Sequence, residues 1–193
     1  KKILARRLPD TGDRALKASR EDKNHARLME QMVADECTFI LQNDITLIST
    51  LVRFLRHGIR GVNLCDKADN MRTAVAIEEA LLNAYYHGNL EVSSELRGQR
   101  QDEFDRLVLE RSQTSPYRDR QIHVKAKYSE LEAVIVIRDE GNGFDHTQIP
   151  DPTDPENLLQ PTGRGLLLMR AFMDELHFNA AGNQVTMIKR RSK

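Results

Sequence analysis

Residues 122–137 carry the pattern of a β-hairpin. The first half alternates apolar with polar residues, a period typical of a half-buried strand, and its apolar positions are Ile122, Val124, Ala126 and Tyr128. Val134–Ile137 is an unbroken β-branched run, which predicts a second and more buried strand. Because an apolar sheet face needs a covering layer, we expect helices on one face of this sheet.

Helical spacing appears upstream of the hairpin. Apolar residues three and four apart predict a helix over 45–55, with Asp44 as its cap and its end at Gly58 or Gly61. A second helix should begin near Asp66 or Asp69 and run to Gly88.

The remaining predicted elements are short. In chain order they are a strand at 37–42, a helix near 104–109, a helix at 165–173 and two closing strands at 176–178 and 184–189. This order predicts an α+β fold with the helices on one face of the sheet.

Length and composition limit the class of protein. A chain of 193 residues with 39% hydrophobic and 30% charged residues is typical of one globular domain. No apolar run is long enough for a transmembrane helix, so we expect no membrane partner. Lys plus Arg equals Asp plus Glu at 29 each, which argues against nucleic acid as a partner. Cys37 and Cys65 lie far apart, as expected for reduced thiols of a cytoplasmic protein.

Two segments differ from the rest in composition. Residues 1–30 contain nine basic and five acidic residues, so 1–35 is interpreted as a linker or the end of a preceding domain, and 36–193 as the main domain. Residues 144–162 contain four of the six prolines, which excludes regular structure and predicts a functional loop acting as a lid.

The second helix carries the first candidate motif. Glu79, Asn83 and His87 are spaced four apart, so they share one helix face. Such a polar row beside apolar neighbours suggests a binding function, although a solvated polar stripe would explain the same spacing.

Two glycine-containing motifs follow. Asp139, Gly141 and Gly143 come directly after the buried strand, where glycines permit close approach of a ligand and the carboxylate can accept a bond from an amine. A plain glycine turn is the alternative. Gly163-Arg164-Gly165 opens an apolar helix, an arrangement that can hold phosphate but is weak evidence by itself.

Taken together and in this order, the three motifs resemble the N box and the two glycine boxes of the GHKL ATPase superfamily. The chain resembles more narrowly the bacterial anti-sigma-factor serine kinases, over about residues 36–190. The resemblance implies a two-layer α/β sandwich, the Bergerat fold, with a mixed sheet, helices on one face and an ATP lid. It also implies ATP and magnesium as cofactors.

The resemblance assigns roles to the motif residues. Glu79 matches the general base, Asn83 the magnesium ligand, and Asp139 the acceptor of the adenine amino group, while the role of His87 stays open. Further nucleotide-binding positions are Gly141 and Gly143 at adenine, Gly163 and Gly165 at phosphate, and Thr186 reaching adenine through water. Arg164 and Arg170 are either phosphate partners or solvated.

The implied function is a Mg-ATP-dependent serine/threonine kinase that acts on a STAS-type antagonist or regulates a sigma factor. Alternatives are the ATP domain of a sensor histidine kinase, and a non-enzymatic ATP switch fused to an upstream receiver domain; a homodimer is also open. The chain has no phosphoacceptor box, because His25 lacks that context. Residues 91–120 are longer than the compact anti-sigma kinases need, either as a partner-docking insert or as a solvated excursion.

Overall fold

The predicted hairpin is present in the computed structural model as β2 (Gln121–Ser129) and β3 (Glu132–Arg138). The structure describes residues 20, 23–24, 27–28, 31–94, 96, 100–145 and 164–191. The alternation predicted from sequence holds, because every second residue of both strands is buried. The hairpin is therefore the centre of the sheet.

Three more strands complete the sheet, which has the order β1-β2-β3-β5-β4. They are β1 (Ala34–Gln42), β4 (Glu175–Phe178) and β5 (Gln184–Arg190). The expectation of a mixed sheet is wrong: all four pairings among the described residues are antiparallel. β3 and β4 do run in the same direction, but β5 folds back between them, so no parallel neighbours arise.

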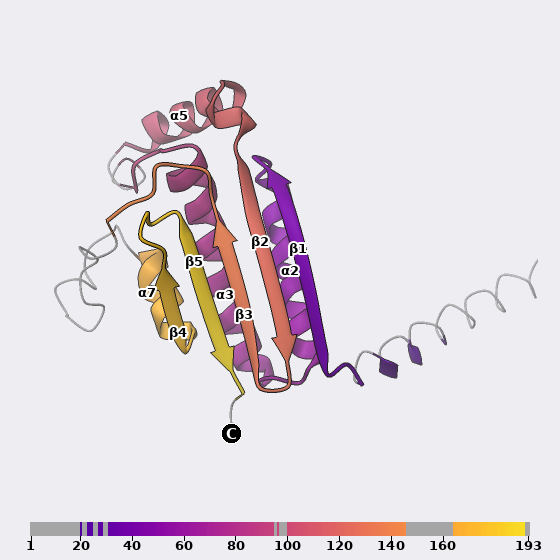
Figure 1. Cartoon of the computed structure of the whole chain (residues 1–193). Helices are drawn as coiled ribbons and strands as arrows, with labels where there is room; N and C mark the ends of the chain where they lie inside the picture. The colour runs from indigo at the N-terminus through magenta and orange to yellow at the C-terminus, as the bar shows by residue number, and fades with distance from the viewer. Residues whose placement is uncertain are drawn as a thin grey trace, which may run out of the picture.

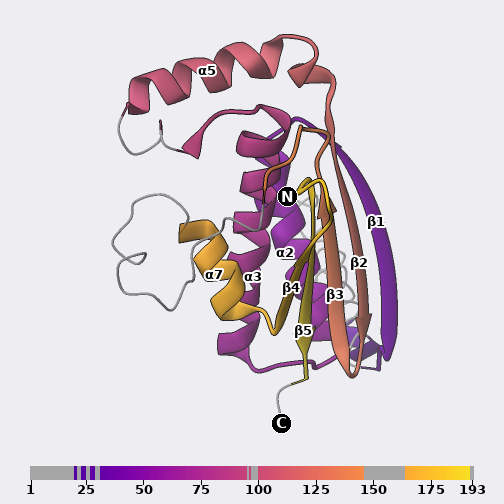
Figure 2. The ribbon, with the colours of Figure 1, turned by 60° about the vertical axis from the view of Figure 1, so that its left-hand side comes forward.

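Helices α2 (Thr46–Gly61), α3 (Lys67–Asn83) and α7 (Arg164–Phe172) cover one face of the sheet (Figures 1 and 2). At the start of α2, the Asp44 carboxylate accepts bonds from the Thr46 N–H at 2.9 Å and the Thr46 hydroxyl at 2.6 Å. Asp66, rather than Asp69, caps α3. Gly58 lies within α2, where a Cβ would meet the Tyr128 ring at 2.6 Å, and the helix ends at Gly61.

The core lies between this helical layer and the sheet. Its fully enclosed side chains come from α2, α3 and the central strands, and include Leu55, Ile59, Ile77, Leu81, Ile122, Ile135, Ile137 and Met187. Among the described residues, no helix has the length and apolar character needed to cross a bilayer.

The segment 91–120 contains α5 (Gln101–Gln113) and the short helix η2 (Tyr117–Asp119), which is more helix than the sequence predicted. α5 lies across the end of the molecule where α3 ends and β2 begins (Figures 1 and 2). Phe104 is only 3% exposed and joins the core, with its ring 5.3 Å from that of Tyr86. α5 is therefore anchored to the core through this side chain.

Candidate active site

Glu79, Asn83 and His87 follow one another along the C-terminal part of α3 and into the next element, as predicted. All three are half-buried. The Nδ1–H of His87 donates to the Val92 carbonyl at 2.6 Å, because a carbonyl can only accept. This bond orients the imidazole and fixes which ring nitrogen carries the proton in its neutral form.

The sequence did not predict the geometry of the helix end. α3 gives way at Ala84 to one π-helical turn, η1 (Ala84–Asn89), and such turns are frequent at functional sites. This turn brings Gly88 against the strand-end motif. A Cβ on Gly88 would overlap the carboxyl group of Asp139, and a Cβ on Gly141 would overlap the carbonyl of Gly88. Both positions therefore need glycine for this close approach.

Asp139 sits where these segments meet. Its carboxylate accepts a bond from the Gly141 N–H at 2.9 Å, and its own N–H donates to the Asn183 carbonyl at 3.0 Å. Burial raises the pKa of Asp139 to about 6, and the bond from Gly141 only partly opposes this rise. A carboxyl group that has lost much of its hydration gains from any ligand that donates a hydrogen bond.

Gly143 fixes the next turn of the same loop. Its φ of +74° lies in the left-handed region, and a Cβ there would overlap the Ala181 carbonyl. The loop consequently packs on the connection between β4 and β5, where the Phe144 and Phe178 rings lie 5.3 Å apart.

The start of α7 meets the polar row of α3. A Cβ built on Gly165 would lie 2.7 Å from Oε2 of Glu79 and 3.5 Å from Nδ2 of Asn83. The first N–H groups of a helix favour anions, so this junction suits a phosphate chain. Arg164 is exposed. Gly163 and residues 146–162 of the predicted lid lie outside the described residues.

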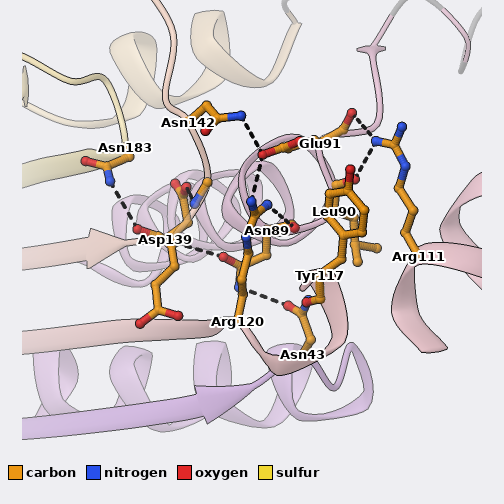
Figure 3. Close-up of polar contacts among 12 residues, drawn as sticks. Asn43, Asn89, Leu90, Glu91, Arg111, Tyr117, Arg120, Asp139, Asn142 and Asn183 are labelled. Atoms are coloured by element: carbon orange, nitrogen blue, oxygen red, sulfur yellow. Dashed lines mark hydrogen bonds and ion pairs between the residues drawn. The ribbon is translucent and has the colours of Figure 1, made fainter. Parts of the chain in front are cut away.

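Sequence reasoning missed Asn89, which is fully buried at the end of η1. Its Nδ2 donates to Oδ1 of Asn43 at 3.0 Å, its Oδ1 accepts from the Glu140 N–H at 2.9 Å, and its carbonyl accepts from Arg120 at 2.8 Å (Figure 3). The only sequence signal was an amide directly after Gly88. Its three partners, Asn43, Arg120 and Glu140, come from three distant segments, which no local pattern reveals.

Comparison with models of protein families shows which family the chain belongs to. A model described as a histidine kinase-like ATPase domain matches residues 41–189. The chain belongs to this family. The match confirms the GHKL resemblance and the two-layer ATPase fold. A search among curated proteins found no match.

For two residues assigned from the resemblance, the assigned role stays a prediction. Thr186 alternates in β5 with the buried Val185 and Met187, so its side chain points to the sheet face away from the helices. Arg170 is exposed in the last turn of α7. Neither is carried into the proposed site.

The described residues offer few side chains that could bind a metal ion. No group of three His, Cys, Asp or Glu with metal-binding placement occurs in the described residues. The expectation of magnesium therefore rests on Asn83, with Glu79 as its carboxylate neighbour one turn away on α3. Magnesium usually takes one or two protein ligands together with phosphates and water, which a single asparagine oxygen fits.

Proposed function

We propose that the chain is a Mg-ATP-dependent protein kinase of the anti-sigma-factor type, which phosphorylates serine or threonine on a STAS-type antagonist. The observation that carries the proposal is the position of Gly165, where an added Cβ would lie against the side chains of Glu79 and Asn83. It joins the helix start suited to phosphate with the residues suited to a base and a metal ligand. Phosphoryl transfer depends chiefly on such positioning.

Each end of the site has a chemical task in this proposal. Asp139 accepts the bond of the adenine amino group, where Gly88 and Gly141 approach it closely. Asn83 offers an oxygen to magnesium, and Glu79 takes the proton of the acceptor hydroxyl. Bound Mg-ATP supplies the phosphoryl group.

The test measures transfer of labelled γ-phosphate to a STAS-type partner from the same genome. Glu79→Gln should lower transfer by about 10²–10⁴-fold while ATP affinity stays within a few-fold, because only the base is lost. Asn83→Ala should weaken Mg-dependent ATP binding as well. Glu78→Gln is the matched control, since Glu78 is the exposed neighbour of Glu79 on α3 and should change neither quantity.

The chemistry of the label separates the alternatives. Acid-stable label that disappears in Glu79→Gln supports the serine/threonine kinase. Acid-labile label on a histidine-containing segment supports a sensor kinase instead. ATP binding without label on any partner supports a non-enzymatic switch, and absence of ATP binding contradicts the proposal altogether.

A further inference from the structure

Glu91 combines an unusual backbone with a central position among polar contacts. Its φ is +52°, in the left-handed region that glycine and asparagine favour. Its Oε1 accepts from Arg120 at 2.9 Å and from Asn142 at 2.7 Å (Figure 3). A residue held in a disfavoured conformation persists when its surroundings determine it, and such positions cluster at functional sites.

On one side, Glu91 is held by Arg111, Tyr117 and Arg120, which belong to the part of the segment 91–120 that contains and follows α5 (the α5 segment). Arg120 bonds the Asn89 carbonyl as well as Glu91, and its side chain is only 16% exposed. Arg111 donates to the carbonyls of Leu90 at 2.8 Å and Glu91 at 2.6 Å. Both guanidinium groups lie over the Tyr117 ring, at 4.9 Å for Arg111 and 5.0 Å for Arg120. These contacts hold residues 89–91 in place.

On the other side, the same residues hold the loop after β3. Glu91 accepts from the side chain of Asn142, and Asn89 accepts from the backbone of Glu140. Asn142 is exposed and lies between Gly141 and Gly143. A Gly-Asn-Gly loop loses much conformational freedom when it is ordered, so a tether that orders it in advance improves ligand affinity.

We infer that Glu91 is a positioning residue that holds the 140–143 loop at the adenine end of the site and, through Arg120, joins this loop to the α5 segment. The inference rests on the proposed nucleotide binding at Asp139. It gives the 91–120 segment a role within the site, because Arg111, Tyr117 and Arg120 all come from it. The phosphate end, at Gly165, lies outside these contacts.

The left-handed backbone allows the side chain to be removed without adding strain. Glu91→Gly removes the carboxylate but suits the observed φ, so the fold should survive. Glu91→Gln keeps an oxygen that can accept from both Asn142 and Arg120. Asn142→Ala cuts the tether from the loop side and leaves the Arg120 pair intact. Asn63→Gly is the matched control, because Asn63 has φ +50° but precedes α3 at its far end.

Calorimetry with Mg-ATP and with Mg-tripolyphosphate separates the two ends of the site. Glu91→Gly and Asn142→Ala should weaken ATP binding by about tenfold, as expected for a lost charge-assisted bond. Tripolyphosphate affinity should stay within about twofold, and Glu91→Gln should restore ATP affinity to within about threefold of wild type. Asn63→Gly should change neither affinity. Equal losses for both ligands, or unchanged ATP affinity in Glu91→Gly, would overturn the inference.

Amide hydrogen exchange of residues 141–143 in the nucleotide-free protein provides a readout independent of ATP. Exchange should be faster in Glu91→Gly and Asn142→Ala than in wild type or Asn63→Gly. Unchanged exchange overturns the positioning role even if the wild-type chain binds no ATP. If exchange is faster in the two variants but the wild-type chain binds no ATP, the positioning role of Glu91 is supported and the proposed function is rejected.

Discussion

Replacing Asp139 by asparagine should stabilise the nucleotide-free protein near neutral pH and at the same time weaken its binding of ATP. The variant keeps an oxygen that can accept from the Gly141 N–H, so the local hydrogen bond survives. It removes a charge whose hydration is reduced by burial. The two effects have opposite signs because the carboxylate is costly in the free protein but useful to a donor ligand.

The magnitude follows from the pKa of Asp139, which is about 6 in the folded protein against an ordinary 3.8. Between these values the folded state binds more protons than the unfolded state, so the free energy of unfolding falls as pH rises and levels off above the folded pKa. For a carboxyl group fully shielded from solvent, this pKa difference would lower the free energy of unfolding by about 3 kcal/mol. Since solvent reaches part of this half-buried carboxyl, we expect about 1–2 kcal/mol.

Urea unfolding of both proteins from about pH 4 to about pH 8 measures this effect. The stability gained by Asp139→Asn should be near zero at the acid end and reach its plateau above about pH 6. Glu140→Gln is the control of opposite sign, because the hydrogen bond from His123 lowers the pKa of Glu140. A gain that does not vary with pH, or a uniform loss, would refute the burial argument for Asp139.

In the same variant, ATP affinity should fall by about 10- to 100-fold, because an amide donor then faces the adenine amino group. Calorimetric titration at neutral pH provides this number. If the variant is more stable but binds ATP with unchanged affinity, Asp139 does not contact adenine. The effect of burial on its carboxylate would then still stand.

Two further substitutions test the packing around the site. Gly165→Ala should leave the urea midpoint nearly unchanged, since alanine favours the helix, but lower phosphoryl transfer by about 10- to 100-fold because its Cβ displaces Oε2 of Glu79; transfer at the wild-type rate would contradict the contact. Phe104→Ala should cost about 3–5 kcal/mol in urea unfolding, because the ring is buried against Tyr86. A cost below about 1 kcal/mol would show that α5 folds apart from the core.

Local patterns predicted the elements with periodic burial. The hairpin formed where the period of two placed it, and Asp66 caps α3 because a carboxylate before a helix meets unpaired N–H groups in any context. The same period gives the orientation of Thr186: it alternates with the buried Val185 and Met187, so it lies on the sheet face away from the helices. The resemblance alone had assigned it to adenine.

The motif order in the sequence determined the family and the polar row at Glu79 and Asn83, since four-residue spacing on a helix is a local property. Only the tertiary structure decided the π-helical turn at Gly88, the raised pKa of Asp139 and the tether from Glu91 to Asn142. The tether joins residues 51 positions apart in the chain, and Gly88 lies against Asp139 across a similar separation, so only folding brings these groups together. Burial and hydrogen bonding across such separations leave no periodic trace in the sequence.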